Sequence, residues 1–190
     1  MSNNINVHQD ANDNSTSSTE KKFELLVVGA GIAGLSFVYG LRRSELYREG
    51  KVGYKIVERR DGPGTDLGYP IHLSSAARKS LESMFSPPDL EKLHHARSKI
   101  PVYHDGITVS SYRGKKAWRT VREPGTRPMI EREELMEILR GGVGVGEVEY
   151  GLEVVSHSQK EGGVEVKLKG REGRREEVKV DLVVDESYIE

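Results

Sequence analysis

The sequence predicts an α/β fold, a parallel sheet with flanking helices that is interrupted by a mixed and antiparallel β segment. Residues Phe23–Val28 form a nearly unbroken apolar run, typical of a strand buried on both faces of a parallel sheet. A glycine-rich turn and a predicted helix over Ile32–Arg43 follow directly. Val52–Val57 predicts a second strand, and only after a long mixed region does a wholly apolar segment return, at Leu182–Val184.

The turn after the first strand has the pattern Gly-x-Gly-x-x-Gly, in which each glycine has a physical task. Gly29 permits the tight turn, Gly31 lets the backbone approach a pyrophosphate, and Gly34 lets the helix pack closely on the strand. The helix start adds unpaired N–H groups and a partial positive charge. We therefore expect the dinucleotide site of a Rossmann-like domain, formed by Gly29, Ala30, Gly31, Ile32, Ala33 and Gly34.

Glu58 ends the second predicted strand and is the second mark of such a site. A carboxylate there accepts hydrogen bonds from the ribose hydroxyls of adenosine and repels a 2′-phosphate. The alternative is an unrelated α/β protein with a glycine-rich turn and an ordinary surface glutamate. The motif itself does not distinguish FAD, NAD and S-adenosylmethionine. An NAD-binding domain would continue its βα alternation, so the long mixed region favours a flavoprotein whose cofactor domain is interrupted by an insertion.

The remaining segments contain weaker signals. Pro87-Pro88 predicts a break between two helices, and the glycines of Gly141–Gly146 predict a helix stop and linker because no buried strand precedes them. Strand character is expected over Ile107–Tyr112, and a hairpin is expected to pair Val164–Leu168 with Val178–Val184. The expected helices are Ser74–Met84, capped by Ser74 or Ser75, then Asp89–Arg97 and Arg132–Arg140.

Composition narrows the function classes. The formal net charge of -1 gives no electrostatic reason to expect a nucleic-acid or acidic-membrane partner, and Leu25–Leu41 is too short and glycine-rich for a membrane span. The chain has no cysteine, which excludes disulfides and thiolate sites and suits a reducing, cytoplasmic location. His94-His95 and His104-Asp105 lack the spacing of metal ligands and are interpreted as surface residues. Residues 1–22 are strongly polar and predict a disordered tail.

In its ordered part, the sequence resembles the FAD-dependent monooxygenases of the aromatic-hydroxylase type, the group A flavoproteins, and especially the fungal ones. LLVVGAGIAGLSFVYGLRR resembles their first strand, turn and helix, and IVERRDGP their second strand with its Glu-Arg end. GYPIHLSSAARKSL resembles the segment that passes the flavin, MIEREELMEIL an Arg-x-x-Leu helix start, and VEYGLEVV with VDLVV the strands that follow. The resemblance implies that Arg59, Gly68 and Arg132 join the glycine turn and Glu58 in binding FAD.

The resemblance also implies an activity. NAD(P)H would reduce the flavin, and a flavin hydroperoxide would hydroxylate or epoxidise a small organic substrate, with aromatic and polycyclic compounds among the candidates. Because the cofactor carries this chemistry, no catalytic side chain is predicted. Residues 23–190 would be the N-terminal part of the FAD-binding domain with a partial substrate-domain insertion. The substrate itself is not predicted, because the segments that would line its pocket are mostly missing from this sequence.

The chain departs from the family after Val184. Where the family continues with Gly-Ala-Asp-Gly, this sequence has Asp185-Glu186-Ser187-Tyr188, and the later Gly-Asp segment is missing. We therefore expect a C-terminally truncated chain that is inactive alone. Two other readings stay open, a non-catalytic truncated flavin-binding fragment with no turnover of its own, and a plain NAD-binding module.

Overall fold

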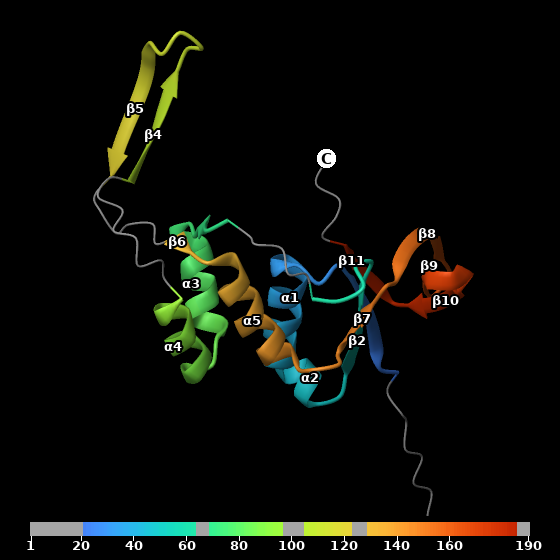
Figure 1. The fold of residues 1–190 in the computed structure, drawn as a ribbon. Helices are drawn as coiled ribbons and strands as arrows, with labels where there is room; N and C mark the ends of the chain where they lie inside the picture. Colours follow the sequence, from blue (N-terminus) through green and yellow to red (C-terminus); the bar gives the residue numbers. More distant parts are fainter. Residues whose placement is uncertain (1–20, 64–68, 97–104, 123–128, 186–190) are drawn as a thin grey trace, which may run out of the picture.

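The computed structural model describes residues 21–63, 69–96, 105–122 and 129–185 (Figure 1). The helices are α1 (Ile32–Arg42), α2 (Glu45–Arg48), α3 (Ser75–Met84), α4 (Pro87–His95) and α5 (Arg132–Val143), with a 3-10 turn η1 at Arg171–Gly173. The strands are β1 (Phe23–Val28), β2 (Val52–Glu58), β3 (Ile71–His72), β4 (Asp105–Ser110), β5 (Lys116–Arg122), β6 (Met129–Ile130), β7 (Val148–Tyr150), β8 (Glu153–Lys160), β9 (Gly163–Lys169), β10 (Arg175–Val180) and β11 (Leu182–Asp185).

The central layer is a four-stranded sheet in the order β11-β1-β2-β7, and all its pairings are parallel. β1 lies between β2 and β11, with Leu25 opposite both Tyr54 and Leu182. The prediction that Phe23–Val28 and Val52–Val57 are strands of one parallel sheet is therefore confirmed. The expected return of an apolar strand to that sheet at Leu182–Val184 is confirmed as well.

The two faces of this sheet pack on different layers. Val27 and Ile56 belong to a core formed with the helices, whereas Leu26 and Val57 pack with the antiparallel sheet β10-β9-β8. Because side chains alternate along a strand, β1 and β2 contribute to both cores, which explains why neighbouring residues such as Leu26 and Val27, or Ile56 and Val57, are both apolar. Figure 1 shows the result, with the helices on one side of the sheet and β8, β9 and β10 on the other.

α5 extends further than the sequence predicts. The expected end at Arg140 is wrong, because the helix runs to Val143, which is fully buried against the helical core. Gly142 allows this extension, since a Cβ placed there would lie 1.9 Å from Cε2 of Tyr39 on α1. The helix stops at Gly144, whose φ of 111° lies in the left-handed region.

The helix pair α3 and α4 begins with serine caps. Ser74 Oγ accepts a hydrogen bond from the N–H of Ala77 at 3.1 Å, which confirms Ser74 as the α3 cap. The prediction that α4 begins at Asp89 is wrong, because Pro87 and Pro88 form its first turn. Proline is tolerated there since the first N–H groups of a helix have no intrahelical partner.

Asp89 joins α4 to α1. Its carboxylate accepts hydrogen bonds from Tyr39 Oη at 2.7 Å and Ser86 Oγ at 2.6 Å, and it pairs with Lys92 Nζ at 3.0 Å. Burial alone would raise the pKa of Asp89, but the hydrogen bonds from Ser86, Tyr39 and Lys92 together lower the pKa below its usual value. The charged form of Asp89 therefore stabilises the packing of these helices.

Two further segments differ from the prediction. The expected hairpin of Val164–Leu168 with Val178–Val184 is confirmed only as far as Val180, because the second segment divides at Asp181 into β10, antiparallel to β9, and β11, parallel to β1. The strand expected over Ile107–Tyr112 is confirmed as far as Ser110 and begins earlier, at Asp105; it is β4, which pairs with β5 to form a hairpin that stands apart from the layers (Figure 1). The strand predicted at Val164–Leu168 is confirmed within β9.

Candidate functional site

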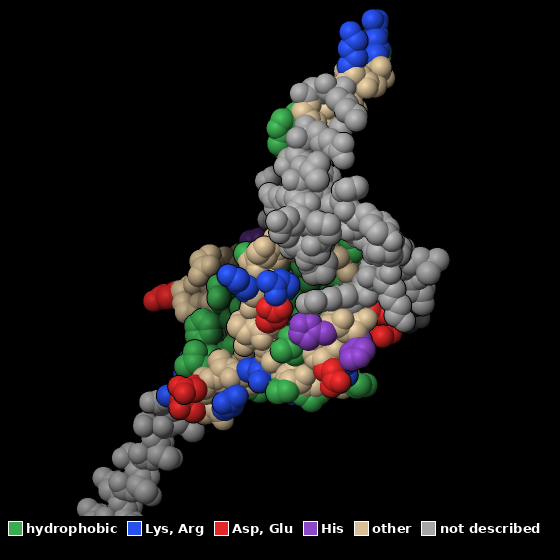
Figure 2. All heavy atoms as spheres, turned by 90° about the vertical axis from the view of Figure 1, so that its left-hand side faces the viewer, with side chains coloured by type: hydrophobic (Ala, Val, Ile, Leu, Met, Phe, Trp, Pro, Cys, Tyr) green, Lys and Arg blue, Asp and Glu red, His purple; other side chains and the backbone are tan. Residues whose placement is uncertain are grey.

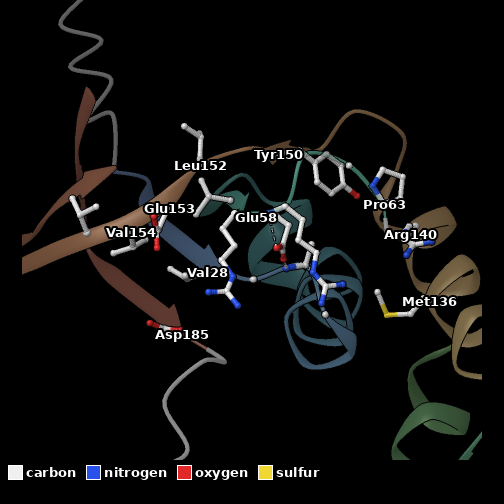
Figure 3. Close-up of a pocket in the computed structure, with 18 of the residues that line it drawn as sticks. Val28, Glu58, Pro63, Met136, Arg140, Tyr150, Leu152, Glu153, Val154 and Asp185 are labelled. Atoms are coloured by element: carbon white, nitrogen blue, oxygen red, sulfur yellow. Dashed lines mark hydrogen bonds between the residues drawn. The ribbon is translucent and has the colours of Figure 1, made fainter. Parts of the chain in front are cut away.

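A cavity of about 610 Å³ lies where β1, β2 and β11 end, and it is bounded on its other sides by α5 and the start of β8 (Figure 3). The carboxyl ends of parallel strands are the usual ligand site of open α/β sheets. Figure 3 shows Glu58 between Met136 and Arg140 on one side and Asp185 and Val154 on the other.

The glycine turn joins β1 to α1 at this cavity, and Gly29, Ala30 and Gly31 line it. Gly29 has a φ of 97°, and its N–H donates a hydrogen bond to the Val57 carbonyl at 2.8 Å. A Cβ at Gly34 would lie 2.2 Å from the carbonyl oxygen of Gly29, so any larger residue there would push the helix away from the turn. Gly31 is the N-cap of α1 and has no side chain to cap the helix.

The Glu58 carboxylate connects β2 to this turn. Its Oε2 accepts a hydrogen bond from the N–H of Ala30 at 2.9 Å, and its Oε1 accepts one from the N–H of Arg60 at 3.0 Å. One side chain thus ties together the start of α1 and the loop that follows β2. Glu58 also pairs in register with Tyr150 of β7, which lines the same cavity.

Four arginines line the cavity together with three carboxylates. Arg59 and Arg60 come from the loop after β2, and Arg132 and Arg140 come from α5, whereas the carboxylates belong to Glu58, Glu153 and Asp185. Arg132, Met136 and Arg140 are spaced by four residues and therefore share one face of α5. Arg140 forms an ion pair with Glu133 at 2.8 Å.

The structure brings most of the predicted site residues together. Gly29, Ala30, Gly31, Glu58, Arg59 and Arg132 line the cavity. Three predicted residues of the first turn of α1 do not line it: Ile32 packs against the helical core, Ala33 is exposed on the outer side of the helix, and Gly34 is buried against the turn. Gly68 lies outside the described residues.

Sequence reasoning missed several residues of the cavity. Arg140 could have been found from its spacing of eight residues from Arg132 on a predicted helix. Tyr150 and the first residues of β8 carry no comparable signal, because only the pairing of β7 with β2 brings them to the site. β8 has a register shift between Val154 and Ser156, which lies within this wall of the cavity.

The described residues contain neither a group of side chains that could hold a metal ion nor a helix that could span a membrane. Within residues 21–63, 69–96, 105–122 and 129–185, no group of three or more His, Asp or Glu side chains is arranged to hold a metal ion. His94 and His95 are exposed on α4, and Figure 2 shows histidine side chains at the surface of the face that it presents. His104 lies outside the described residues. Among the described helices, none is long and apolar enough to cross a membrane.

No protein-family profile matches the sequence, and no curated protein matches it. Solved structures do resemble the fold. Tetracycline destructase Tet(51) has a TM-score of 0.59 at 24% identity, over 88% of this chain and 39% of that protein. FqzB has a TM-score of 0.62 at 18% identity, over 86% of this chain and 36% of FqzB.

The rebeccamycin biosynthetic enzyme RebC with reduced flavin has a TM-score of 0.58 at 16% identity, over 87% of this chain and 33% of RebC. The chain thus spans between 33% and 39% of the length of these three neighbours. They are FAD-dependent monooxygenases related to the group A flavoprotein hydroxylases. The fold of this chain therefore matches that of part of each of these three proteins.

Proposed function

We propose that the chain is the FAD-binding portion of a flavin-dependent monooxygenase, and that the ADP half of FAD binds at the turn Gly29–Gly34. The observation that carries this proposal is the hydrogen bond from the Ala30 N–H to Glu58 Oε2 at 2.9 Å. Through this bond, a carboxylate that would accept the ribose hydroxyls lies directly beside the helix start that would bind the pyrophosphate. Both groups line the same cavity.

The residues of the turn fit a dinucleotide. Gly34 holds α1 close to the turn, because any Cβ at this position would overlap the Gly29 carbonyl oxygen. Gly31 keeps the N-cap of α1 free of a side chain, which leaves room for a phosphate at the helix N-terminus. α1 has no acidic residue in its first turn that would repel an anion. These features support a Rossmann-like role for the turn.

The charged residues of the cavity support distinct roles toward FAD. An ionised carboxylate has about four lone-pair sites, so Glu58 can accept ribose hydroxyls while it holds two backbone N–H groups. Arg59 and Arg132 would offset the charge of the pyrophosphate. Glu153 and Asp185 oppose an anion, and Figure 3 places them across Glu58 from Arg140, so we expect the phosphates toward the arginine side.

When bound, FAD would supply the redox and oxygen-transfer chemistry, with NAD(P)H as electron donor and O2 as co-substrate. The residues of this chain would bind and orient the ADP half, and none of them is proposed as a catalytic acid, base or nucleophile. The neighbour RebC is known with bound 7-carboxy-K252c and with reduced flavin, which supports a small organic substrate and a flavin here.

A second candidate function is a flavin-binding chain without catalytic turnover of its own. This candidate agrees with the finding that the chain spans only 33% to 39% of the length of the three neighbours. The two candidates differ in one measurement. The chain is incubated with FAD, NAD(P)H and a panel of aromatic and polycyclic compounds. Product formed in proportion to NAD(P)H consumed supports the monooxygenase, and FAD binding without such product supports the second candidate.

Titration of the purified chain with FAD, followed by flavin fluorescence, tests the proposed binding site. Gly31→Val places a side chain where the pyrophosphate would lie, so we expect binding to weaken by at least roughly 100-fold. Gly141→Val is the matched control, because a Cβ at Gly141 meets nothing within 4 Å and the residue lies outside the cavity. Equal FAD affinity in Gly31→Val and the parent chain would show that the turn is not the phosphate site.

A further inference from the structure

We infer that Glu58 is a positioning residue, which holds the glycine turn in its phosphate-binding shape before any ligand arrives. This role is separate from its proposed contact with ribose, although it concerns the same site and rests on the proposed function. The two last residues of β2 hold two successive residues of the turn. The Val57 carbonyl accepts the N–H of Gly29 at 2.8 Å, and Glu58 Oε2 accepts the N–H of Ala30 at 2.9 Å.

The turn needs such a restraint. Gly29 has a φ of 97°, and glycine has access to more backbone conformations than any other residue. A hydrogen bond to an ionised carboxylate is about twice as strong as one between neutral groups, so the bond to Ala30 selects one conformation of the turn. Since the Ala30 N–H donates to Glu58, it does not point to the ligand as a free donor. Glu58 therefore defines which N–H groups are presented to the ligand.

The second oxygen makes Glu58 sensitive to conservative substitution. Oε1 accepts the N–H of Arg60 at 3.0 Å, so both oxygens of the carboxylate act as acceptors. In Glu58→Gln the side chain keeps its length, but its amide nitrogen is a donor and cannot face a backbone N–H. Either Ala30 or Arg60 would lose its acceptor. Glu58→Asp keeps the charge but is one methylene shorter, and it cannot span both groups.

Calorimetric titrations with two ligands separate the positioning role from ribose binding. ADP has both ribose hydroxyls, whereas 2′,3′-dideoxyadenosine diphosphate has none and retains the phosphates. If Glu58 positions the turn, Glu58→Gln weakens binding of the dideoxy ligand by roughly 10-fold, because the phosphate site itself is loosened. If Glu58→Gln binds the dideoxy ligand as well as the parent does and loses affinity for ADP alone, Glu58 is only a ribose acceptor and the inference is wrong.

Glu161→Gln is the matched control, with the same change of charge at an exposed position between β8 and β9, outside the cavity. We expect it to bind both ligands as the parent does. Far-UV circular dichroism of each variant checks that the fold is kept. Should Glu58→Gln fail to fold, Glu58→Asp, which is expected to show the same loss for the dideoxy ligand, takes its place.

Amide hydrogen exchange of the ligand-free chain gives an independent readout by NMR. The Ala30 amide is expected to exchange at least about 10-fold faster in Glu58→Gln or Glu58→Asp than in the parent, because its acceptor is lost or displaced. An unchanged Ala30 exchange rate in both variants would overturn the inference. Failure of the parent to bind ADP or FAD would instead overturn the proposed function, and the exchange result would then stand by itself as a statement about the turn.

Discussion

Gly34 provides a quantitative test of how closely α1 packs on the turn. In Gly34→Ala the new Cβ would lie 2.2 Å from the Gly29 carbonyl oxygen, whereas Cβ contacts below 3.0 Å are essentially never seen. The helix and turn would have to separate by about 0.8 Å. Overpacking typically costs about 1–3 kcal/mol, and the upper end applies here because a backbone atom cannot rotate away. The better helix propensity of alanine offsets roughly 1 kcal/mol of this.

We therefore expect Gly34→Ala to lower the free energy of unfolding by about 2 kcal/mol. Gly40→Ala is the control in the same helix, since its Cβ would meet only Met84 Sδ at 3.4 Å, an ordinary contact with a flexible side chain. Gly40→Ala should raise the free energy of unfolding by up to about 1 kcal/mol. The assay is urea unfolding followed by circular dichroism. Equal midpoints for the two variants would refute the close-packing argument.

Three further predictions concern the helical layer and the cavity. Gly142→Ala should lower the free energy of unfolding, measured in urea, by about 1–3 kcal/mol, because its Cβ would lie 1.9 Å from Tyr39 Cε2. Gly141→Ala, whose Cβ would meet nothing within 4 Å, should raise the free energy of unfolding by up to about 1 kcal/mol, and equal effects of the two substitutions would contradict this packing. The pKa of Asp89 is lower in the folded chain than its ordinary value of 3.8, so the stability that its charged form contributes is present above 3.8 and is lost as pH falls through the folded-state pKa. The midpoint temperature of thermal unfolding should therefore fall less steeply with pH in this range for Asp89→Asn than for the parent. Arg132→Ala should weaken FAD binding by roughly 10-fold in a fluorescence titration, and an unchanged dissociation constant would remove Arg132 from the site.

The part of the site that could be predicted from the sequence is formed by local patterns. A buried strand, the turn Gly29–Gly34 and a helix follow one another without interruption, and Glu58 ends the next strand. Parallel strands of a βα unit bring their carboxyl ends together, so the proximity of the turn and Glu58 follows from these patterns. The 2.9 Å bond between Ala30 and Glu58 was not predicted, because a sequence does not specify side-chain direction.

The rest of the cavity depends on pairings between distant residues. Tyr150 reaches the site because β7 pairs with the end of β2, and β8 reaches it through the turn that follows β7. The end of α5 was misjudged for a related reason. Glycines at 141, 142 and 144 look alike in the sequence. Gly142 lies inside the helix, where the ring of Tyr39 leaves no room for a Cβ, whereas Gly144 ends the helix with a positive φ. Tertiary packing decides between these outcomes, and local propensity does not.

A calorimetric comparison of FAD, FMN and NAD+ on the purified chain tests the central claim most directly. All three ligands contain phosphate, but FMN lacks the adenosine half, and NAD+ lacks the flavin. If the ADP half of FAD binds at the Gly29–Gly34 turn beside Glu58 and the flavin extends from it, FAD should bind most tightly and FMN should bind at least about 10-fold more weakly. Tighter binding of NAD+ than FAD, or equal binding of FMN and FAD, would contradict the proposed flavin site.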